Sequence, residues 1–280
     1  NKLMVNLYPQ SVTERCSLKC VHCNHSLPYL KNPVNFKKEE FIADLDLFFS
    51  HVDYIYSADF VGGEPFVHPD FYGMMKYAAE HYRSRMFRML FVTNGTIVPS
   101  DEILELMKEY NIQFWFSDYR TNVPQIQHSV EAFLQRVEKS GVTILRNELE
   151  TWSDYALGKA DIKFANEEEK IRYFDYCGTP CRYMRNGRLY YCTSDRMAQR
   201  AGLVEEDCDS YLDLKTITPD RRMEILEFDL GFNTKGYLNT CTKCNGPYLF
   251  SVTPVPKGVQ CTQKQLQDFP KQCPFPGIEV

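Results

Sequence analysis

The sequence of 280 residues contains no stretch that approaches the roughly 18 consecutive apolar residues of a transmembrane helix. Its first residues, NKLMVNLYP, lack the charged and apolar regions of a signal peptide. Lysine and arginine form no basic run, and the formal net charge is -5. We therefore expect a cytoplasmic protein with no nucleic-acid partner and no membrane partner.

The eleven cysteines do not indicate a disulfide framework. Such frameworks belong to small secreted domains that lack a hydrophobic core. A chain of 280 residues with 44% hydrophobic content can bury a full core. Metal ligation in a reducing compartment is therefore the more economical explanation of the clustered cysteines.

Three of these cysteines, Cys16, Cys20 and Cys23, form a C-x3-C-x2-C triad. A structural zinc site needs four ligands, and a bacterial ferredoxin segment uses C-x2-C-x2-C spacing, so the triad fits neither pattern. It fits a [4Fe-4S] cluster in which one iron has no protein ligand. The alternatives are three buried structural cysteines or half of a zinc site.

The segment TERCSLKCVHCN at residues 13–24 resembles the C-x3-C-x-Φ-C loop of the radical S-adenosylmethionine family. The resemblance implies that the triad binds a [4Fe-4S] cluster whose free iron chelates the amino and carboxylate groups of S-adenosylmethionine. The Φ position, which is usually aromatic, is His22. A planar imidazole can take the same place beside the adenine.

A second motif, GGEP at residues 62–65, follows a predicted strand. Alone it is an ordinary tight turn, but glycine lets a backbone approach a ligand closely, and a carboxylate can bind an ammonium group. The motif is similar to the family's G-G-E sequence, which holds the methionine amino group. Polar residues also follow the later predicted strands, where plain turn or loop residues are the alternative interpretation. The resemblance implies this cofactor-binding set: His22, Gly62, Gly63, Glu64, Pro65, Thr93, Asn94, Ser117, Asp118 and Arg146.

Strands and helices alternate along the first half of the chain. Apolar runs predict strands at residues 3–8, where Pro9 would end the first strand, and at 54–61, 87–92, 112–116, 142–145 and 162–164. The helical period predicts helices at 36–52, after Asp70, after Ser100 and at 130–137, stopped near Gly141. This alternation implies a parallel sheet with ligands at the carboxyl ends of its strands. We expect an α/β fold, a partial (β/α)6 TIM-like barrel over residues 1–165.

Residues 166–280 are expected to form a small β-hairpin-plus-helix domain of the twitch type, followed by a C-terminal tail. Asn186-Gly187 predicts a type I′ hairpin turn. The cysteine spacing around it resembles the opening of a SPASM domain, an auxiliary-cluster domain, but Phe250 stands where the longer two-cluster form continues with cysteine. The resemblance implies one auxiliary [4Fe-4S] cluster, hence two clusters in all. Its ligands would be Cys177, Cys192, Cys241 and Cys244, with Cys181 as a substitute for Cys177. A structural zinc site of four cysteines is the alternative.

The resemblance implies a radical S-adenosylmethionine oxidoreductase. Its 5′-deoxyadenosyl radical would take a hydrogen atom from the substrate, and the auxiliary cluster would take an electron. We expect two-electron oxidation of a sugar-like or cyclitol-like alcohol, with flavodoxin or ferredoxin as reductant. The alternatives are a maturase that modifies a short ribosomal peptide and a zinc-stabilised binding protein without catalysis. Tyr119 and Arg120 are candidates to face the substrate, and Cys208 is a candidate hydrogen donor.

Overall fold

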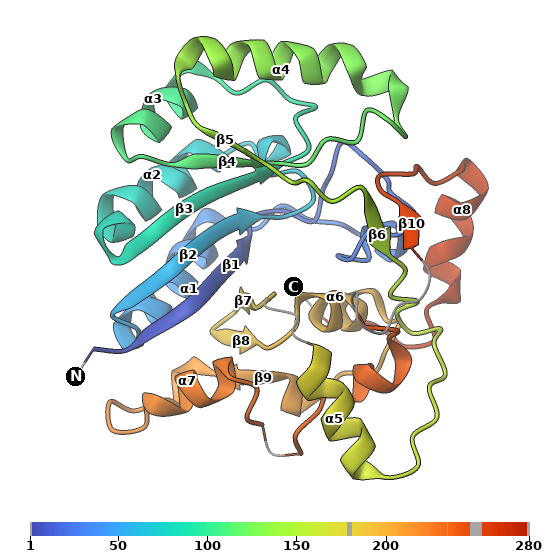
Figure 1. Cartoon of the computed structure of the whole chain (residues 1–280). Coiled ribbons are helices and arrows are strands. Elements are labelled where there is room, and N and C mark those ends of the chain that lie inside the picture. Colours follow the sequence, from blue (N-terminus) through green and yellow to red (C-terminus); the bar gives the residue numbers. More distant parts are fainter. Residues whose placement is uncertain (1, 178–180, 234, 247–253, 279–280) are drawn as a thin grey trace.

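The computed structural model describes residues 2–177, 181–233, 235–246 and 254–278. Its largest sheet has five parallel strands in the order β1-β2-β3-β4-β5. The strands span Met4–Ser11, Tyr54–Val61, Met86–Thr93, Gln113–Phe116 and Ile144–Arg146. Between them run α1 (Lys38–His51), α2 (Phe71–Tyr82), α3 (Asp101–Glu109) and α4 (Gln127–Ser140). These helices lie on the outer side of the curved sheet (Figure 1), which confirms the α/β class and the partial barrel.

Two expectations about the strands are wrong. Residues 162–164 form no strand: the Ile162 amide donates to the Thr242 carbonyl at 3.3 Å, and the Phe164 ring packs edge-on against Tyr173. Their apolar side chains therefore serve the packing of the C-terminal part. The first strand does not end before Pro9 either, because Pro9 pairs with Asp59 inside β1. A proline is tolerated there because β1 is an edge strand of the five-stranded sheet.

The main core lies between the sheet and its helices, and aromatic side chains fill much of it. Phe48 of α1, Phe60 of β2 and Phe91 of β3 are fully buried in one cluster. Local signals set the helix ends: the Ser100 hydroxyl accepts from the Ile103 amide at the start of α3, and Gly141 ends α4 with a φ of 76°. With helices on the outer side alone, the inner side of the sheet faces the C-terminal part of the chain (Figure 1).

The C-terminal part contains α5 (Glu167–Cys177), α6 (Thr193–Ala201) and α7 (Met223–Asp229) around a small antiparallel sheet. That sheet has the order β7-β8-β9, with strands Tyr183–Arg185, Arg188–Tyr190 and Tyr211–Asp213. Asn186 and Gly187 join β7 to β8 with φ values of 54° and 81°, which confirms the type I′ turn. Both turn amides donate to the buried carboxylate of Asp44 in α1, so the hairpin is attached to the barrel.

The end of the described chain returns to the barrel. Strand β10 (Pro254–Pro256) pairs antiparallel with β6 (Thr151–Ser153), and α8 (Gln263–Asp268) follows (Figure 1). This pairing joins residues on either side of the predicted boundary at residue 165, which itself stays a prediction.

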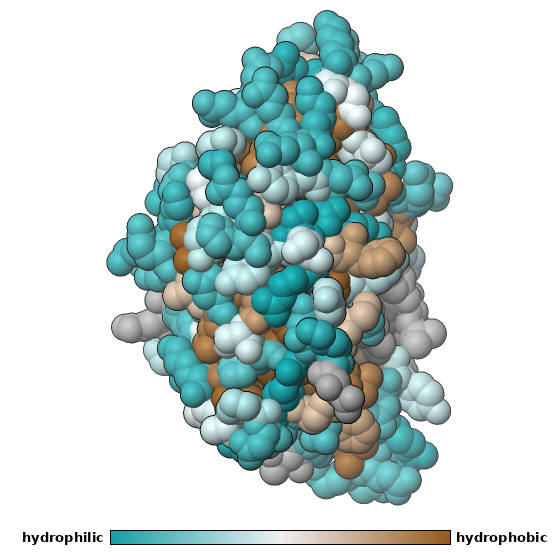
Figure 2. Space-filling view, turned by 90° about the vertical axis from the view of Figure 1, so that its left-hand side faces the viewer, coloured by the Kyte–Doolittle hydropathy of each residue, from teal (hydrophilic) through white to brown (hydrophobic). Residues whose placement is uncertain are grey.

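None of the helices in the described ranges combines the length and the apolar character needed to cross a membrane. Figure 2 looks onto the left-hand side of Figure 1, where β1, β2 and β3 begin. Hydrophilic residues predominate on this face, with hydrophobic residues scattered among them. The predicted cofactor motifs lie at the other ends of these strands.

Candidate functional site

The first three cysteines lie in the loop that follows β1. Burial raises the pKa of the Cys16 thiol to about 12, and the nearby charges of Glu64 and Cys23 act in the same direction. Burial also raises the pKa of Cys20 to about 12. The pKa of Cys23 is raised by burial as well. Cys20 lies close enough to Cys16 and Cys23 for their charges to raise its pKa further. A buried group of thiols is ionised when a cationic metal centre binds it. The triad is therefore chemically suited to hold one.

The GGEP motif packs directly against this loop. A Cβ atom on Gly62 would lie 2.6 Å from the Thr13 carbonyl oxygen, and one on Gly63 would lie 2.1 Å from the Arg15 carbonyl oxygen. The Gly63 amide donates to the Thr13 carbonyl, and the Glu64 amide donates to the Arg15 carbonyl, both at 2.9 Å. The two glycines are thus required by a backbone-to-backbone contact that positions the cysteine loop.

Glu64 connects two of the predicted motifs. Its side chain is fully buried. Its carboxylate accepts hydrogen bonds from the Thr93 hydroxyl at 2.9 Å and from the backbone amide of Asn94 at 2.8 Å. Burial raises the pKa of Glu64 to about 7, although these hydrogen bonds oppose the shift. Pro65 follows at the first position of a 3-10 helix. The ends of β2 and β3 are therefore joined through one buried carboxyl group.

Two amide side chains reach the sulfur atoms of the triad. Asn94 Nδ2 lies 3.6 Å from Cys16 Sγ and 3.2 Å from Ser17 Oγ. Gln260, from the C-terminal tail, donates to Cys20 Sγ at 3.3 Å. Hydrogen bonds to the sulfurs of an iron-sulfur site tune its reduction potential. Gln260 was not among the residues predicted from the sequence, because no local pattern marks a residue that lies 240 positions after its partner.

Tyr119, in the segment after β4, packs against the same loop. Burial raises the pKa of Tyr119, and the charges of Cys20, Cys23 and Cys16 add to the shift, so the phenol lies near the triad. Asp118 and Arg120 bind each other in a two-pronged ion pair with a closest approach of 2.6 Å. Burial would raise the pKa of Asp118, but the hydrogen bonds and charge of Arg120 outweigh it and lower that pKa. Ser117 is buried, and its amide donates to the Thr93 carbonyl.

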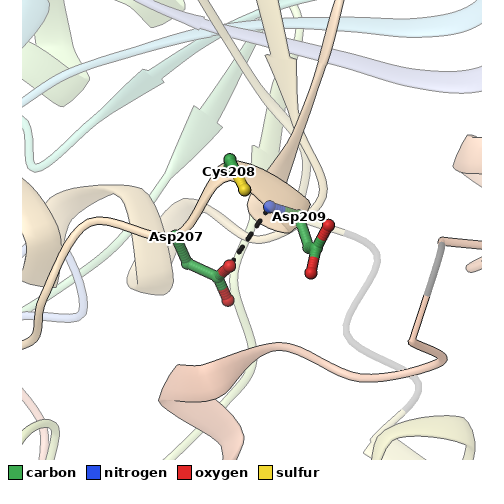
Figure 3. A group of neighbouring side chains, drawn as sticks. All are labelled: Asp207, Cys208 and Asp209. Atoms are coloured by element: carbon green, nitrogen blue, oxygen red, sulfur yellow. Dashed lines mark hydrogen bonds between the residues drawn. The ribbon is translucent and has the colours of Figure 1, made fainter.

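His22 and Arg146 lie at the margins of this arrangement, whereas Cys208 lies in the C-terminal part, between α6 and β9. His22 Nδ1 lies 3.4 Å from a carboxylate oxygen of Asp154, beside a cavity of about 150 Å³. The Arg146 guanidinium lies 5.7 Å from the Phe116 ring centre. Cys208 is exposed between Asp207 and Asp209 (Figure 3), and the structure gives its side chain no hydrogen bond to another described residue. The predicted roles of these three residues stay predictions.

A second group of thiols forms in the C-terminal part. Burial raises the pKa of Cys192 and that of Cys241. Burial also raises the pKa of Cys244, to about 12. The charge of Cys177 raises all three further, so the hairpin returns Cys192 to the neighbourhood of Cys177. Burial also raises the pKa of Cys181, where the charges of Asp59 and Cys177 contribute. The charges that raise the pKa values of Cys192, Cys241 and Cys244 thus include that of Cys177 rather than that of Cys181.

The separation of the sulfur atoms bears on which metal centre fits. In the described part of the chain, only Asp207, Cys208 and Asp209 offer three ligand atoms that all lie within 4.8 Å of one another. A tetrahedral zinc ion with Zn–S bonds of about 2.3 Å would hold its sulfurs about 3.8 Å apart. Among the described residues, neither cysteine group contains three sulfurs that close.

The Asp207, Cys208 and Asp209 group (Figure 3) has a cationic partner that offsets one of its two carboxylate charges. Lys235 Nζ lies 3.3 Å from a carboxylate oxygen of each aspartate. The Asp209 amide donates to Asp207 within the group, and Asp207 also accepts from the Asn239 amide. These contacts attach the loop between α6 and β9 to the segment before Cys241.

An ion pair that the sequence did not predict attaches the cysteine loop to the C-terminal part. Arg200 of α6 binds Glu14 with Nε 2.9 Å and Nη2 3.1 Å from its carboxylate oxygens. Glu14 is only 2% exposed, and it also accepts from the Val34 amide. The loop therefore has three supports: the GGEP backbone, the C-terminal tail and α6.

Comparisons with known proteins agree with this arrangement. Residues 11–154 match the family model of the Radical SAM superfamily. A segment of 100 residues is 33% identical to the antilisterial bacteriocin subtilosin biosynthesis protein AlbA of Bacillus subtilis (strain 168). That segment covers 35% of this chain and 20% of AlbA, so the chain matches only a fifth of that relative's length.

Similar solved structures include BtrN in complex with AdoMet and 2-DOIA, with 15% identity and a TM-score of 0.45. That match covers 88% of this chain and 94% of BtrN. Another is histidine-tagged anSMEcpe with bound AdoMet, with 14% identity, a TM-score of 0.41 and coverage of 96% and 93%.

Proposed function

The chain belongs to the radical SAM superfamily, and from that premise we propose that it is an oxidoreductase that acts on a sugar-like or cyclitol-like alcohol. Two [4Fe-4S] clusters would take part, one on each cysteine group. The oxidation would convert a secondary alcohol to a ketone. The flavodoxin or ferredoxin expected as reductant belongs to the same proposal.

In the first site, the residues of this chain bind and orient. Cys16, Cys20 and Cys23 would hold the first cluster, which when bound and reduced would supply the electron for cleavage of S-adenosylmethionine to methionine and a 5′-deoxyadenosyl radical. Glu64 offers a buried carboxyl group beside this site, suited to the methionine ammonium group. Asn94 and Gln260 donate hydrogen bonds to the ligating sulfurs. Tyr119 and Arg120, which follow β4, are proposed to face the substrate.

The composition of the second thiol group carries the proposal of an oxidation. Four neighbouring thiols, those of Cys177, Cys192, Cys241 and Cys244, can ligate every iron of a [4Fe-4S] cluster. A cluster held in this way has no free iron for substrate, so its available role is to accept an electron. Removal of a hydrogen atom, then an electron and a proton, takes two hydrogens from the substrate and leaves a ketone.

The test uses protein purified without oxygen, with iron and sulfide restored and a strong reductant added. Incubation with S-adenosylmethionine and a panel of cyclitols and aminocyclitols should give 5′-deoxyadenosine and a product lighter by two hydrogens. Cys192→Ala should still form 5′-deoxyadenosine but lose the oxidised product. Cys273→Ala, outside both groups, is the matched control. Oxidised product at unchanged yield from Cys192→Ala would contradict the proposed electron acceptor.

One observation favours a second candidate function, modification of a ribosomal peptide. The relative with 33% identity is named for the biosynthesis of the bacteriocin subtilosin. A peptide panel in the same assay separates the two candidates, since a crosslink or oxidation also removes hydrogens. Epimerisation would instead leave the mass unchanged and incorporate deuterium from solvent, with Cys208 as the proposed hydrogen donor. Zinc without sulfide in the purified protein would favour the non-catalytic alternative.

A further inference from the structure

A cavity of about 330 Å³ lies on the C-terminal part, apart from both cysteine groups. The β7–β8 hairpin, α6 and the end of the described chain enclose it, and three arginines and one glutamate line it: Arg185, Arg188, Arg196 and Glu206. None of these residues belongs to the proposed catalytic machinery.

Arg196 is the central feature of this cavity. It is 3% exposed, and its Nε and Nη1 atoms are buried without a hydrogen-bond partner among the described residues. No carboxylate of the described chain forms an ion pair with it. Its guanidinium lies 5.2 Å from the ring centre of Tyr190 and 5.9 Å from that of Tyr183. The two rings pack against the flat cation and give Nε and Nη1 no hydrogen-bond acceptor.

The other charges of the cavity are nearly balanced. Arg185 is 4% exposed, and its Nη2 donates to Glu40 at 2.7 Å, while its Nε is also buried without a partner in the described chain. Arg188 at the rim lies 3.6 Å from Glu206. Glu40 and Glu206 therefore compensate two of the three guanidinium charges. One positive charge, that of Arg196, has no compensating carboxylate among the residues that the structure describes.

A buried guanidinium without a counter-ion destabilises a folded protein, because the charge has lost its water and gained no partner. Guanidinium donors match the geometry of carboxylate and phosphate oxygens, which bind them in pairs. From these observations we propose that the cavity is a binding site for an oxyanion, a carboxylate or phosphate group carrying a single net charge. Arg196 is the main ligand, and Arg185 Nε is the second donor.

The experiment measures thermal unfolding of the full chain with its iron and sulfide restored. The probes are acetate and inorganic phosphate, each titrated against sodium chloride at equal ionic strength. At least one probe should raise the unfolding temperature in a saturable way. A preference for acetate assigns a carboxylate group, and a preference for phosphate assigns a phosphate group. No response beyond that of chloride would overturn the proposal.

Arg196→Met tests the ligand itself, because methionine keeps an apolar side chain between the two tyrosine rings. The apparent affinity for the probe should fall at least about tenfold, the loss expected for a charge-assisted hydrogen bond. Without probe, this variant should unfold at the same or a higher temperature, since a buried uncompensated charge is gone. Arg221→Met, which removes an exposed arginine, is the matched control.

Two further results distinguish an oxyanion site from a structural arginine and from a site filled by the chain itself. If Arg196→Met lowered the unfolding temperature and left the probe response unchanged, the arginine would be structural and the proposal would be wrong. Glu279→Gln should not alter the rise in unfolding temperature that the probe causes. A larger rise would mean that the chain's own carboxylate occupies the site, and the proposal of an external ligand would be wrong. Formation of 5′-deoxyadenosine, measured on the same samples, should be unaffected by Arg196→Met, so failure of the proposed function is seen separately.

Discussion

The side-chain amide of Gln260 donates a hydrogen bond to the sulfur of Cys20 across 3.3 Å. The same side chain accepts from the Lys19 amide at 2.7 Å. Backbone hydrogen bonds on either side, from Val21 to Val259 and from Cys261 to Lys19, make the tail a short antiparallel partner of the cysteine loop. The geometry of the first site therefore depends on a segment near the other end of the chain.

Replacing Gln260 should shift the reduction potential of the first site. The amide N–H favours the more electron-rich, reduced state, so Gln260→Leu should make the potential more negative, on the order of tens of millivolts. Redox titration followed by electron paramagnetic resonance measures the change. Gln263→Leu, an exposed position in α8, is the control. Equal potentials for Gln260→Leu and wild type would show that this hydrogen bond has no tuning role.

Adding one methyl group at Gly63 should displace the cysteine loop. The new Cβ would lie 2.1 Å from the Arg15 carbonyl oxygen, and backbone atoms cannot move as a flexible side chain can. We expect Gly63→Ala to lower the free energy of unfolding by at least about 1–3 kcal/mol and to lower iron content. Gly73→Ala in α2 is the comparison, because its Cβ would meet only the side-chain ends of Asp70 and Lys38, which can move aside. Denaturant unfolding and iron analysis check both effects.

The Glu14–Arg200 pair should contribute strongly to stability. Arg200→Met would leave the Glu14 carboxylate, 2% exposed, without its cationic partner. We expect a loss of about 3 kcal/mol in the free energy of unfolding. The double variant Glu14→Gln/Arg200→Met should recover part of this loss, since no buried charge remains. If the double variant lost as much free energy of unfolding as Glu14→Gln and Arg200→Met lose in sum, the two side chains would not interact.

Asp53 should make stability depend on pH in the acid range. Its carboxylate accepts from the Leu3 amide and from Arg222, and these bonds lower the pKa of Asp53 to about 2. The ordinary pKa in an unfolded chain is about 3.9. The native state then holds fewer protons than the unfolded state, so this contribution is present above about pH 4 and disappears as pH falls toward about 2.

Asp53→Asn should therefore be less stable than wild type at neutral pH and should flatten the stability curve between these pH values. Because Asp53 is partly solvated, we expect a contribution of only about 1 kcal/mol. Denaturant midpoints measured across the acid range provide the check. Parallel curves for variant and wild type would contradict the assignment.

The two neighbouring cysteines Cys177 and Cys181 should differ in their effect on iron content. The charge of Cys177 raises the pKa values of Cys192, Cys241 and Cys244. The pKa of Cys181 responds first to burial and to the charges of Asp59 and Arg182. Cys177→Ser should lower the iron from about eight to about four per chain, and Cys181→Ser should leave about eight. The opposite result would make Cys181 the ligand.

Much of the fold was predictable from local patterns. The span of β2, the end of α4 at Gly141 and the hairpin turn at Asn186-Gly187 each follow from a periodicity or a backbone preference within a few residues. The two errors have one cause. Whether Pro9 or the apolar residues 162–164 join a sheet depends on neighbours that are distant in the sequence: Asp59 in the first case, Thr242 and Tyr173 in the second.

Local spacing in the sequence defines the cysteine groups and the glycine motif, because ligand spacing and glycine content are short-range properties of a chain. Tertiary structure alone decided what surrounds them: Gln260 beside Cys20, Arg200 beside Glu14, and Arg196 without a counter-ion among the described residues. Burial and partner choice are long-range properties. They arise only when the chain folds and brings residues separated by more than 240 positions, such as Lys19 and Cys261, within hydrogen-bonding distance.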